Sequence, residues 1–356
     1  MRTLSTENPG RDVRRYLKHW SNPAFVEERL VGHHAGLKAD QRRRKAREVA
    51  VCIQQGLEYI ETSDASSLAT KPLPLFYAIE NFAKGVCVFA DPSLHADDFR
   101  AHGLSHDPSK RYSLKSLVAT VQRPGKDVWS RFLRLGNTVR SVIDVHFDTD
   151  PQTVDVEVTF SPRVSHGKKL RLGALVRALP ELIDDLKYAG WETSFVVHVP
   201  TYRFDLFSGP PESMSRRIMV RHRHHAPTKA LVLKAAPVKL RGYSIARDHL
   251  DVVEFRSPRS TADVEAPSLV PDLFGELYID FNTGHVDLAE PLVYYAILFV
   301  LSSAVRYEPE QWQRLLDDHP AEGILVERML DVATRKIPNL ILNKLEGQLV
   351  QFKVAR

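Results

Sequence analysis

The stretch that decides the fold reads PLPLFYAIENFAK at residues 72–84 and stays apolar as far as residue 90. Pro72 and Pro74 suit the first turn of a helix, and Pro92 follows its end, so the stretch predicts a helix from about residue 73 to residue 90. Apolar side chains surround most of this helix, and its polar residues fall on one narrow stripe: Tyr77, Glu80, Asn81 and Lys84. We therefore expect other elements to pack against it on nearly every side.

A second apolar stretch begins with PLVYYAILF at residues 291–299 and runs on to RYEPEQW at residues 306–312. Its most hydrophobic part is shorter than the roughly 20 residues that a membrane span needs, and it contains Ser302 and Ser303. The sequence therefore predicts a buried central helix here and no association with a membrane.

A third helix is indicated between residues 42 and 62, where apolar residues recur at helical spacing. We expect the three helices to pack into one bundle. The first turn of the helix at 42–62 carries Arg43 and Arg44, whose charges oppose the helix dipole. An anionic ligand would relieve that cost, which makes these arginines candidates for phosphate binding; a solvated helix start with salt partners elsewhere is the alternative.

The middle of the chain changes character, because alternating polar and apolar residues replace the helical pattern. One helix, at about 172–188, interrupts this region, and loops are expected at 208–213 and 257–271. Strands are predicted at residues 153–160, 194–199, 230–234, 252–255 and 276–281.

The predicted fold is therefore α+β, with a helical bundle built from both ends of the chain and a β-rich region between them. We expect a polar, irregular N-terminal arm at residues 1–40, a helical region at 41–145 and a β-rich region at 146–285. Residues 286–356 should form C-terminal helices that pack back on the N-terminal ones.

The composition is that of a soluble globular protein, with 43% hydrophobic and 26% charged residues among 356. The net charge of +5 fits a protein that meets nucleic acid or nucleotides, although unrelated proteins share it. The two isolated cysteines, Cys52 and Cys87, make no disulfide framework and indicate a reducing, cytoplasmic setting. The first residues have no apolar core, so no secretory signal is expected.

The two apolar stretches, with the order of elements between them, resemble the YaaC-like family over most of residues 42–320. The first stretch alone resembles the broader HEPN helical superfamily, through the steps Phe76-Tyr77-Ala78 and Ala83-Lys84-Gly85 and the following His102-Gly103-Leu104. The resemblance implies a HEPN-like helical bundle, a tendency to assemble into oligomers, and a role in stress responses or phage defence.

Many HEPN proteins are metal-independent ribonucleases that use an arginine and a histidine four to six residues apart, and Arg100 and His106 have that spacing. A histidine can move a proton at neutral pH, and an arginine can hold the phosphate, so no metal or other cofactor is required. Ala101 departs from the family's pattern, which usually has a polar residue after the arginine. His102 is a further candidate; alternatively, it caps a helix or bonds a carbonyl where the chain turns at Gly103.

The densest basic stretch, RRIMVRHRHH at residues 216–225, has the alternation of a strand with one basic face. Its arginines are candidates for phosphate contact, and the alternative is a solvated edge that discourages aggregation. No cysteine or carboxylate stands close enough to complete a metal site with its histidines. The candidates are Arg216, Arg217, Arg221 and Arg223.

Arg306 ends the second apolar helix, where an unpaired charge would be costly. It either forms an internal ion pair with Glu80, Glu308 or Glu310, or lines a polar pocket between helices with Glu80, Lys84 and His102. Glu80 and Lys84 stand four residues apart on their helix and can pair.

Motifs for phosphate loops, serine hydrolases and zinc peptidases are absent from the sequence. Three function classes remain. The first is a protein that binds RNA, DNA or a nucleotide through the basic surface and the pocket. The second is a metal-independent ribonuclease that uses Arg100 with His106 or His102, and the third is a non-catalytic subunit that works with a protein partner or a second copy.

Overall fold

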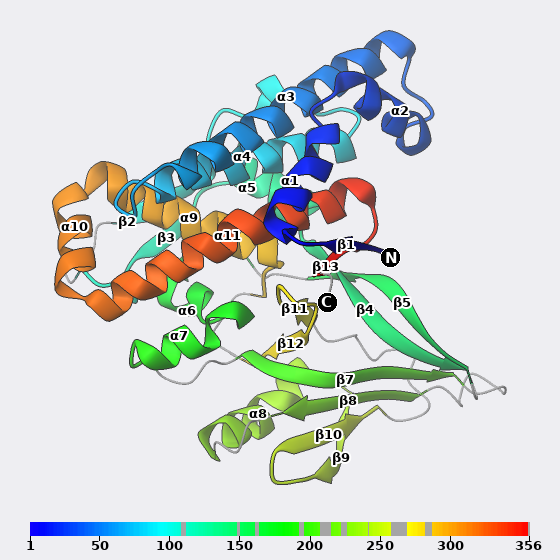
Figure 1. Cartoon of the computed structure of the whole chain (residues 1–356), viewed down its shortest axis with the longest axis vertical. Helices are drawn as coiled ribbons and strands as arrows, with labels where there is room; N and C mark the ends of the chain where they lie inside the picture. The colour runs from blue at the N-terminus through cyan, green and yellow to red at the C-terminus, as the bar shows by residue number, and fades with distance from the viewer. Residues whose placement is uncertain are drawn as a thin grey trace.

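The protein has an α+β fold in which a layer of helices lies over a β-rich part (Figure 1). The N- and C-terminal segments supply the helical layer, and the middle of the chain supplies most of the strands, as the sequence predicts. The computed structural model describes residues 1–107, 112–147, 150–160, 164–191, 196–206, 215–221, 226–240, 242–257, 269–281 and 287–354.

The helical layer is built around α4 (Pro72–Ala90), which packs against α3 (Ala39–Asp64), α9 (Glu290–Tyr307) and α11 (Pro320–Glu346). These are the three predicted helices together with the long C-terminal one, and helices from both ends of the chain lie against α4. The other helices are α1 (Pro9–His19), α2 (Pro23–His33), α5 (Val128–Leu135), α6 (Leu172–Val176), α7 (Ile183–Tyr188), α8 (Ala226–Lys239) and α10 (Pro309–Asp318).

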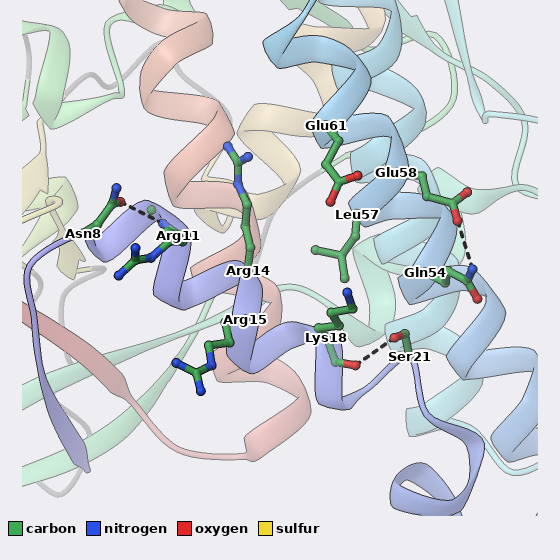
Figure 2. Close-up of a pocket in the computed structure, with 11 residues that line it drawn as sticks. Asn8, Arg11, Arg14, Arg15, Lys18, Ser21, Gln54, Leu57, Glu58 and Glu61 are labelled. Atoms are coloured by element: carbon green, nitrogen blue, oxygen red, sulfur yellow. Dashed lines mark hydrogen bonds between the residues drawn. The ribbon is translucent and has the colours of Figure 1, made fainter.

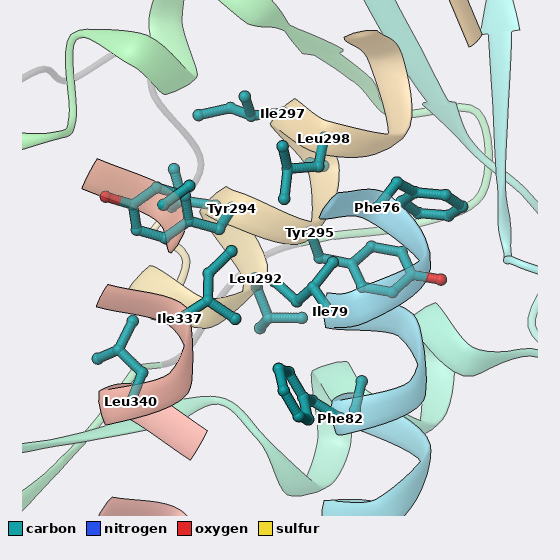
Figure 3. Close-up of a cluster of buried hydrophobic side chains, with 14 of the residues drawn as sticks. Phe76, Ile79, Phe82, Leu292, Tyr294, Tyr295, Ile297, Leu298, Ile337 and Leu340 are labelled. Atoms are coloured by element: carbon teal, nitrogen blue, oxygen red, sulfur yellow. The ribbon is translucent and has the colours of Figure 1, made fainter. Parts of the chain in front are cut away.

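Interlocking side chains of α4, α9 and α11 fill the centre of this layer (Figure 3). Phe76 of α4 meets Tyr295 of α9 edge to face, with ring centroids 5.6 Å apart. Figure 3 shows that Ile79 and Phe82 of α4 point toward the region occupied by Leu292 of α9. By length and composition α4 could cross a membrane, but 72% of that stretch is buried inside the structure. In this structure α4 is a core helix of the helical layer.

The strands of the described residues form three sheets. A small sheet has the order β2 (Leu104–Asp107), β3 (Val118–Val121) and β6 (Lys169–Arg171), and β1 (Arg2–Thr6) pairs in parallel with β13 (Val350–Val354). The largest sheet runs in the order β11 (Leu269–Pro271), β12 (Leu277–Asp280), β7 (Val196–Leu206), β8 (Ser215–Arg221), β10 (Val252–Arg256), β9 (Ser244–Asp248). The hairpin of β4 (Thr138–Phe147) and β5 (Asp150–Thr159) joins it because β4 also pairs with β7.

One face of the largest sheet is covered by α8. Ile218 and Val220 of β8 and Phe255 of β10 bury their side chains against Val232 of α8. Side chains alternate between the two faces of a strand, so the residues between these belong to the opposite face.

Three expectations from the sequence are wrong. Residues 1–40 do not form an irregular arm: they contain β1, α1 and α2, and Leu17 of α1 and Leu30 of α2 are fully buried in the core. Residues 230–234 belong to α8 instead of a strand, because a helix places Val232 on the sheet. The helix expected at 172–188 is divided into α6 and α7 by a short 3-10 turn at Pro180. The loop predicted at 208–213 and most of the one at 257–271 lie outside the described residues.

The end of α4 depends on a buried amine of α3. Lys45 is 1% exposed, and its Nζ donates hydrogen bonds to the carbonyl oxygens of Val88 (3.1 Å), Asp91 (3.0 Å) and Leu94 (2.7 Å). The last carbonyls of a helix have no partner within the helix. Burial lowers the pKa of Lys45, although the nearby carboxylates Glu48 and Asp91 oppose that shift.

Replacing this amine should destabilise the fold. We expect Lys45→Met to lower the free energy of unfolding by about 3 kcal/mol, because it leaves buried carbonyl oxygens without a donor. Urea-induced unfolding measures the loss. Arg43→Met, on an exposed position of the same helix, is the matched control and should change stability by less than about 0.5 kcal/mol. Equal losses in the two variants would contradict this role of Lys45.

Candidate functional site

An open pocket of about 590 Å³ lies between β2 and the C-terminal end of α9. Its lining includes His102, just before β2, His106 in β2, and Arg306 at the end of α9. The structure thus brings together three of the residues that the sequence analysis selected, although about 200 positions separate the histidines from the arginine. Ser303 and Gln311 also line the pocket, and the sequence offered no signal that would have identified them.

The backbone at His102 is held firmly by its neighbours. Gly103 has a φ of +88°, and a Cβ atom there would lie 2.1 Å from Oδ1 of Asp127, so the turn after His102 requires glycine. The carbonyl oxygen of His102 accepts hydrogen bonds from the Tyr295 hydroxyl and from the Trp129 amide, both at 3.0 Å.

The imidazole of His102 is oriented by Glu80 of α4. The distance between Nδ1 of His102 and Oε1 of Glu80 is 2.8 Å, and the ring packs edge to face on Phe76 with centroids 5.2 Å apart. Since the other ring nitrogen, Nε2, is on the opposite edge, it is the one left to meet a ligand in the pocket. The side chain of His102 is 35% exposed.

Glu80 is almost completely buried, with 6% of its side chain exposed. Burial alone would raise the pKa of Glu80, but the hydrogen bond with His102 and the charge of Lys84 outweigh it and lower the pKa. Lys84 lies 3.4 Å from Glu80, which confirms the predicted pair. Glu80 and Lys84 stand behind His102 and do not line the pocket themselves. An ionised Glu80 favours a proton on Nδ1 of His102.

His106 also has a carboxylate partner. Its Nε2 lies 2.9 Å from Oε2 of Glu308, at the junction of α9 and α10, and the side chains are 6% and 10% exposed. Nδ1 of His106 is buried and has no hydrogen-bond partner among the described residues. The sequence analysis selected His106 but assigned Glu308 to a different cation.

Arg306 lacks the ion pair that was expected for it. Its Nε donates a hydrogen bond to the carbonyl oxygen of Ser302 (3.2 Å), and its guanidinium group stacks on the ring of Tyr307. The three carboxylates considered as partners bind other cations: Glu80 binds His102 and Lys84, Glu308 binds His106, and Glu310 binds Arg314. No carboxylate in the described part of the chain neutralises Arg306, so its charge is available to an anion.

Arg100 does not take part in this site. Its side chain is exposed, its amide donates to the carbonyl oxygen of Lys126 (2.7 Å), and it is not among the residues that line the pocket. The expected combination of Arg100 with His106 is therefore not assembled here; the arginine that accompanies the two histidines is Arg306.

The candidate arginines of β8 are divided between the two faces of the sheet. Arg216 shares the α8 face with Ile218, whereas Arg217 and Arg221 lie on the opposite face. Arg223 lies outside the described residues.

Arg43 and Arg44 are at the start of α3, at the end of the molecule opposite to β8 (Figure 1). Arg44 is paired with Glu48 at 3.0 Å, and Arg43 is exposed. These two arginines and those of β8 therefore do not form one surface.

A second hollow, of about 920 Å³, lies between α1 and α3 (Figure 2). Arg11, Arg15 and Lys18 of α1 form one wall and Glu58 and Glu61 of α3 the other, so cations face carboxylates. The sequence analysis missed it because residues 1–40 were not expected to be helical. Its mixed charge does not select one class of ligand as clearly as the first pocket does.

Within the described parts of the chain, no three His, Cys, Asp or Glu side chains converge as metal ligands. What the first pocket offers is an unpaired guanidinium group beside a histidine that a buried carboxylate orients. Such groups bind anions and transfer protons.

Fold and pocket define an α+β protein with a pocket that contains two histidines and an arginine at the edge of its helical layer. The chain matches the model of the family described as YaaC-like Protein over residues 15–345 and belongs to that family. This confirms the YaaC-like part of the resemblance seen in the sequence. No curated protein and no solved structure matches the chain.

The ion pair beneath the pocket predicts a pH-dependent stability. The pKa of Glu80 is lower in the folded protein than its ordinary value of 4.5, so its contribution is fully present above pH 4.5 and is lost as the pH falls through the folded pKa. We expect Glu80→Gln to reduce the free energy of unfolding by about 2 kcal/mol at neutral pH and by progressively less in acid.

Urea unfolding of both proteins between about pH 7 and pH 3 measures this difference. Glu61→Gln, at an exposed site on α3, is the control and should show little effect at any pH. A stability loss in Glu80→Gln that stays constant down to the acid limit would refute the charged pair.

Proposed function

We propose that this protein binds a phosphate ester in the pocket lined by His102, His106 and Arg306. The ester is a nucleotide or an RNA phosphate. The observation that carries the proposal is the unpaired guanidinium group of Arg306, which shares a pocket with the oriented imidazole of His102. A guanidinium group presents paired N–H donors that match phosphate oxygens, and Nε2 of a histidine adds a further hydrogen bond.

The surrounding contacts favour an anionic ligand over a cationic one. The two carboxylates near the pocket, Glu80 and Glu308, already bind cationic or histidine partners and are nearly buried. Tyr307 and Phe299 supply apolar surface beside the polar groups, as binding pockets for organic phosphates generally require. A HEPN-like ancestry of residues 72–104 and a role in stress or phage defence belong to this proposal through the sequence resemblance. A cytoplasmic location belongs to it through the two isolated cysteines.

Removing the guanidinium group tests the binding proposal. We expect Arg306→Gln to weaken binding of nucleoside monophosphates at least tenfold, which corresponds to about 1.4 kcal/mol, because the charged hydrogen bonds to phosphate are lost. Isothermal titration calorimetry with the four ribonucleotides measures it. Arg314→Gln is the control, since Arg314 is exposed on α10 and paired with Glu310. Equal affinities in the two variants, or no binding by the wild type, would refute the pocket.

A second function, metal-independent RNA cleavage, is favoured by one particular observation: the carboxylate of Glu80 orients His102 beside Arg306 in the pocket. In this reaction a base removes the proton of the ribose 2′-hydroxyl, whose oxygen attacks the phosphorus. The 5′-oxygen leaves and takes a proton from an acid, giving a 2′,3′-cyclic phosphate. His102 would serve as the base through Nε2, a water molecule would protonate the leaving oxygen, and Arg306 would stabilise the charge on the phosphate. His106 would contribute only to the wall of the pocket, because its Nε2 is bound to Glu308 and its Nδ1 is buried.

The cleavage hypothesis predicts which arginine matters. With total RNA in the presence of EDTA, we expect the wild type and Arg100→Ala to produce 2′,3′-cyclic phosphate ends and His102→Gln and Arg306→Gln to lose at least a hundredfold in rate. Circular dichroism of each variant controls for unfolding. Loss of cleavage in Arg100→Ala together with normal cleavage by His102→Gln would contradict a site at His102 and Arg306. That result would support the pair of Arg100 and His106 predicted from the sequence spacing.

A further inference from the structure

Three arginines stand in a row across the largest sheet. In the strand register, Arg203 of β7 is opposite Arg217 of β8, and Arg217 is opposite Arg256 of β10. The neighbouring residues Tyr202, Ile218 and Phe255 point toward α8, so the arginines belong to the face that α8 leaves uncovered.

Like charges directly opposite each other destabilise a sheet, so this row carries a cost in the absence of a counter-charge. Glu254 of β10 supplies part of it: its carboxylate lies 3.2 Å from Arg217, 2.7 Å from Arg256 and 3.7 Å from Arg247 of β9. Burial would raise the pKa of Glu254, but the bond with Arg256 and the other cations outweigh it and lower the pKa. Three guanidinium groups thus share a single carboxylate.

The part of this face formed by β8, β9 and β10 is positively charged. Arg221, two same-face positions further along β8, is exposed, and four arginines (217, 221, 247 and 256) against one carboxylate (254) leave a net charge of +3 among the described residues of these three strands. Acidic residues lie on the neighbouring strands, with Asp144 of β4 opposite Arg203 and Asp280 on β12. The side chains of Arg217, Arg256 and Arg247 are 31%, 42% and 63% exposed, so a ligand can reach them.

We propose that this arginine row binds a nucleic-acid strand through its phosphates. Neighbouring strands of a sheet lie about 4.8 Å apart, so the row extends over about 10 Å, which is too wide for a single phosphate and suits a chain of them. The surface is separate from the histidine pocket, and its ligand is a polymer rather than a nucleotide.

The same face predicts how the strand is recognised. Among the described side chains of β8, β9 and β10, none is an exposed aromatic ring on which a base could stack. Contacts to phosphate alone carry little sequence information and depend steeply on salt. Binding should therefore be similar for different base sequences and should weaken quickly as salt is added.

Fluorescence anisotropy with labelled oligouridylate and oligothymidylate of about 20 nucleotides tests this surface. With three or four phosphate contacts on a single strand, the slope of log affinity against log salt should be about −2 to −3 between about 50 and 200 mM salt. The double variant Arg203→Gln/Arg256→Gln should bind about tenfold more weakly and reduce the size of the slope by about 1.4.

The matched control is Arg47→Gln/Arg123→Gln, which has the same net charge as the row variant but changes exposed arginines elsewhere. A gain-of-function variant covers the case in which the loss variant is unstable. Ser244 of β9 is opposite Arg256 and exposed, so Ser244→Arg extends the row by one cation and should steepen the slope by about 0.7.

Equal binding by the row variant and the control, or an unchanged slope in Ser244→Arg, would overturn the proposal, as would binding to phosphatidylserine vesicles without binding to either oligonucleotide. Titration with mononucleotides separates the two sites. Arg203→Gln/Arg256→Gln should keep the wild-type affinity for mononucleotides. Arg306→Gln should lose its affinity for mononucleotides, but its binding to the oligonucleotides should keep the wild-type dependence on salt.

Discussion

The enclosure of α4 is the constraint on which the rest of the structure depends. Because α3, α9 and α11 cover this helix, each polar group on it must find a partner inside the protein. Glu80 finds His102, and that contact turns the histidine toward the pocket. The site is therefore a consequence of core packing: the helix that holds the core together also carries the carboxylate that orients the imidazole.

Elsewhere, too, buried charges connect parts of the fold. Lys336 of α11 contacts Glu181 and Glu290 and donates a hydrogen bond to the carbonyl oxygen of Pro271 on β11 (2.8 Å), so one amine joins the helical layer to the edge of the largest sheet. Burial raises the pKa of Glu290 to about 8, against the opposing charge of Lys336. Partnered charges of this kind contribute less to net stability than apolar packing does, but leaving one of them unpaired is costly, which favours a single arrangement of the two parts.

The sequence predicted the elements whose pattern is local. Helices α3, α4 and α9 could be identified because apolar residues repeat along them. His102 could be selected because it precedes the turn at Gly103, and Arg306 because it stands at the end of an apolar helix. That Arg306 lacks a carboxylate partner could not be predicted, since the sequence does not show that all three candidate carboxylates bind other cations. The arginine row could not be predicted either, because it arises from the register of three strands, and of its members only Arg217 belonged to a recognisable basic stretch.

The pairing of β1 with β13 places residues 2–6 beside residues 350–354. A ribosome adds roughly 5 to 20 residues each second, so the first strand waits on the order of 20 to 70 s for its partner to be synthesised. During that interval Leu17 and Trp20 of the following segment cannot be fully covered, because α11, against which α1 packs, is also made late. The beginning of the chain is thus the last part to be secured, and it is where a chaperone or a premature contact with another chain would act.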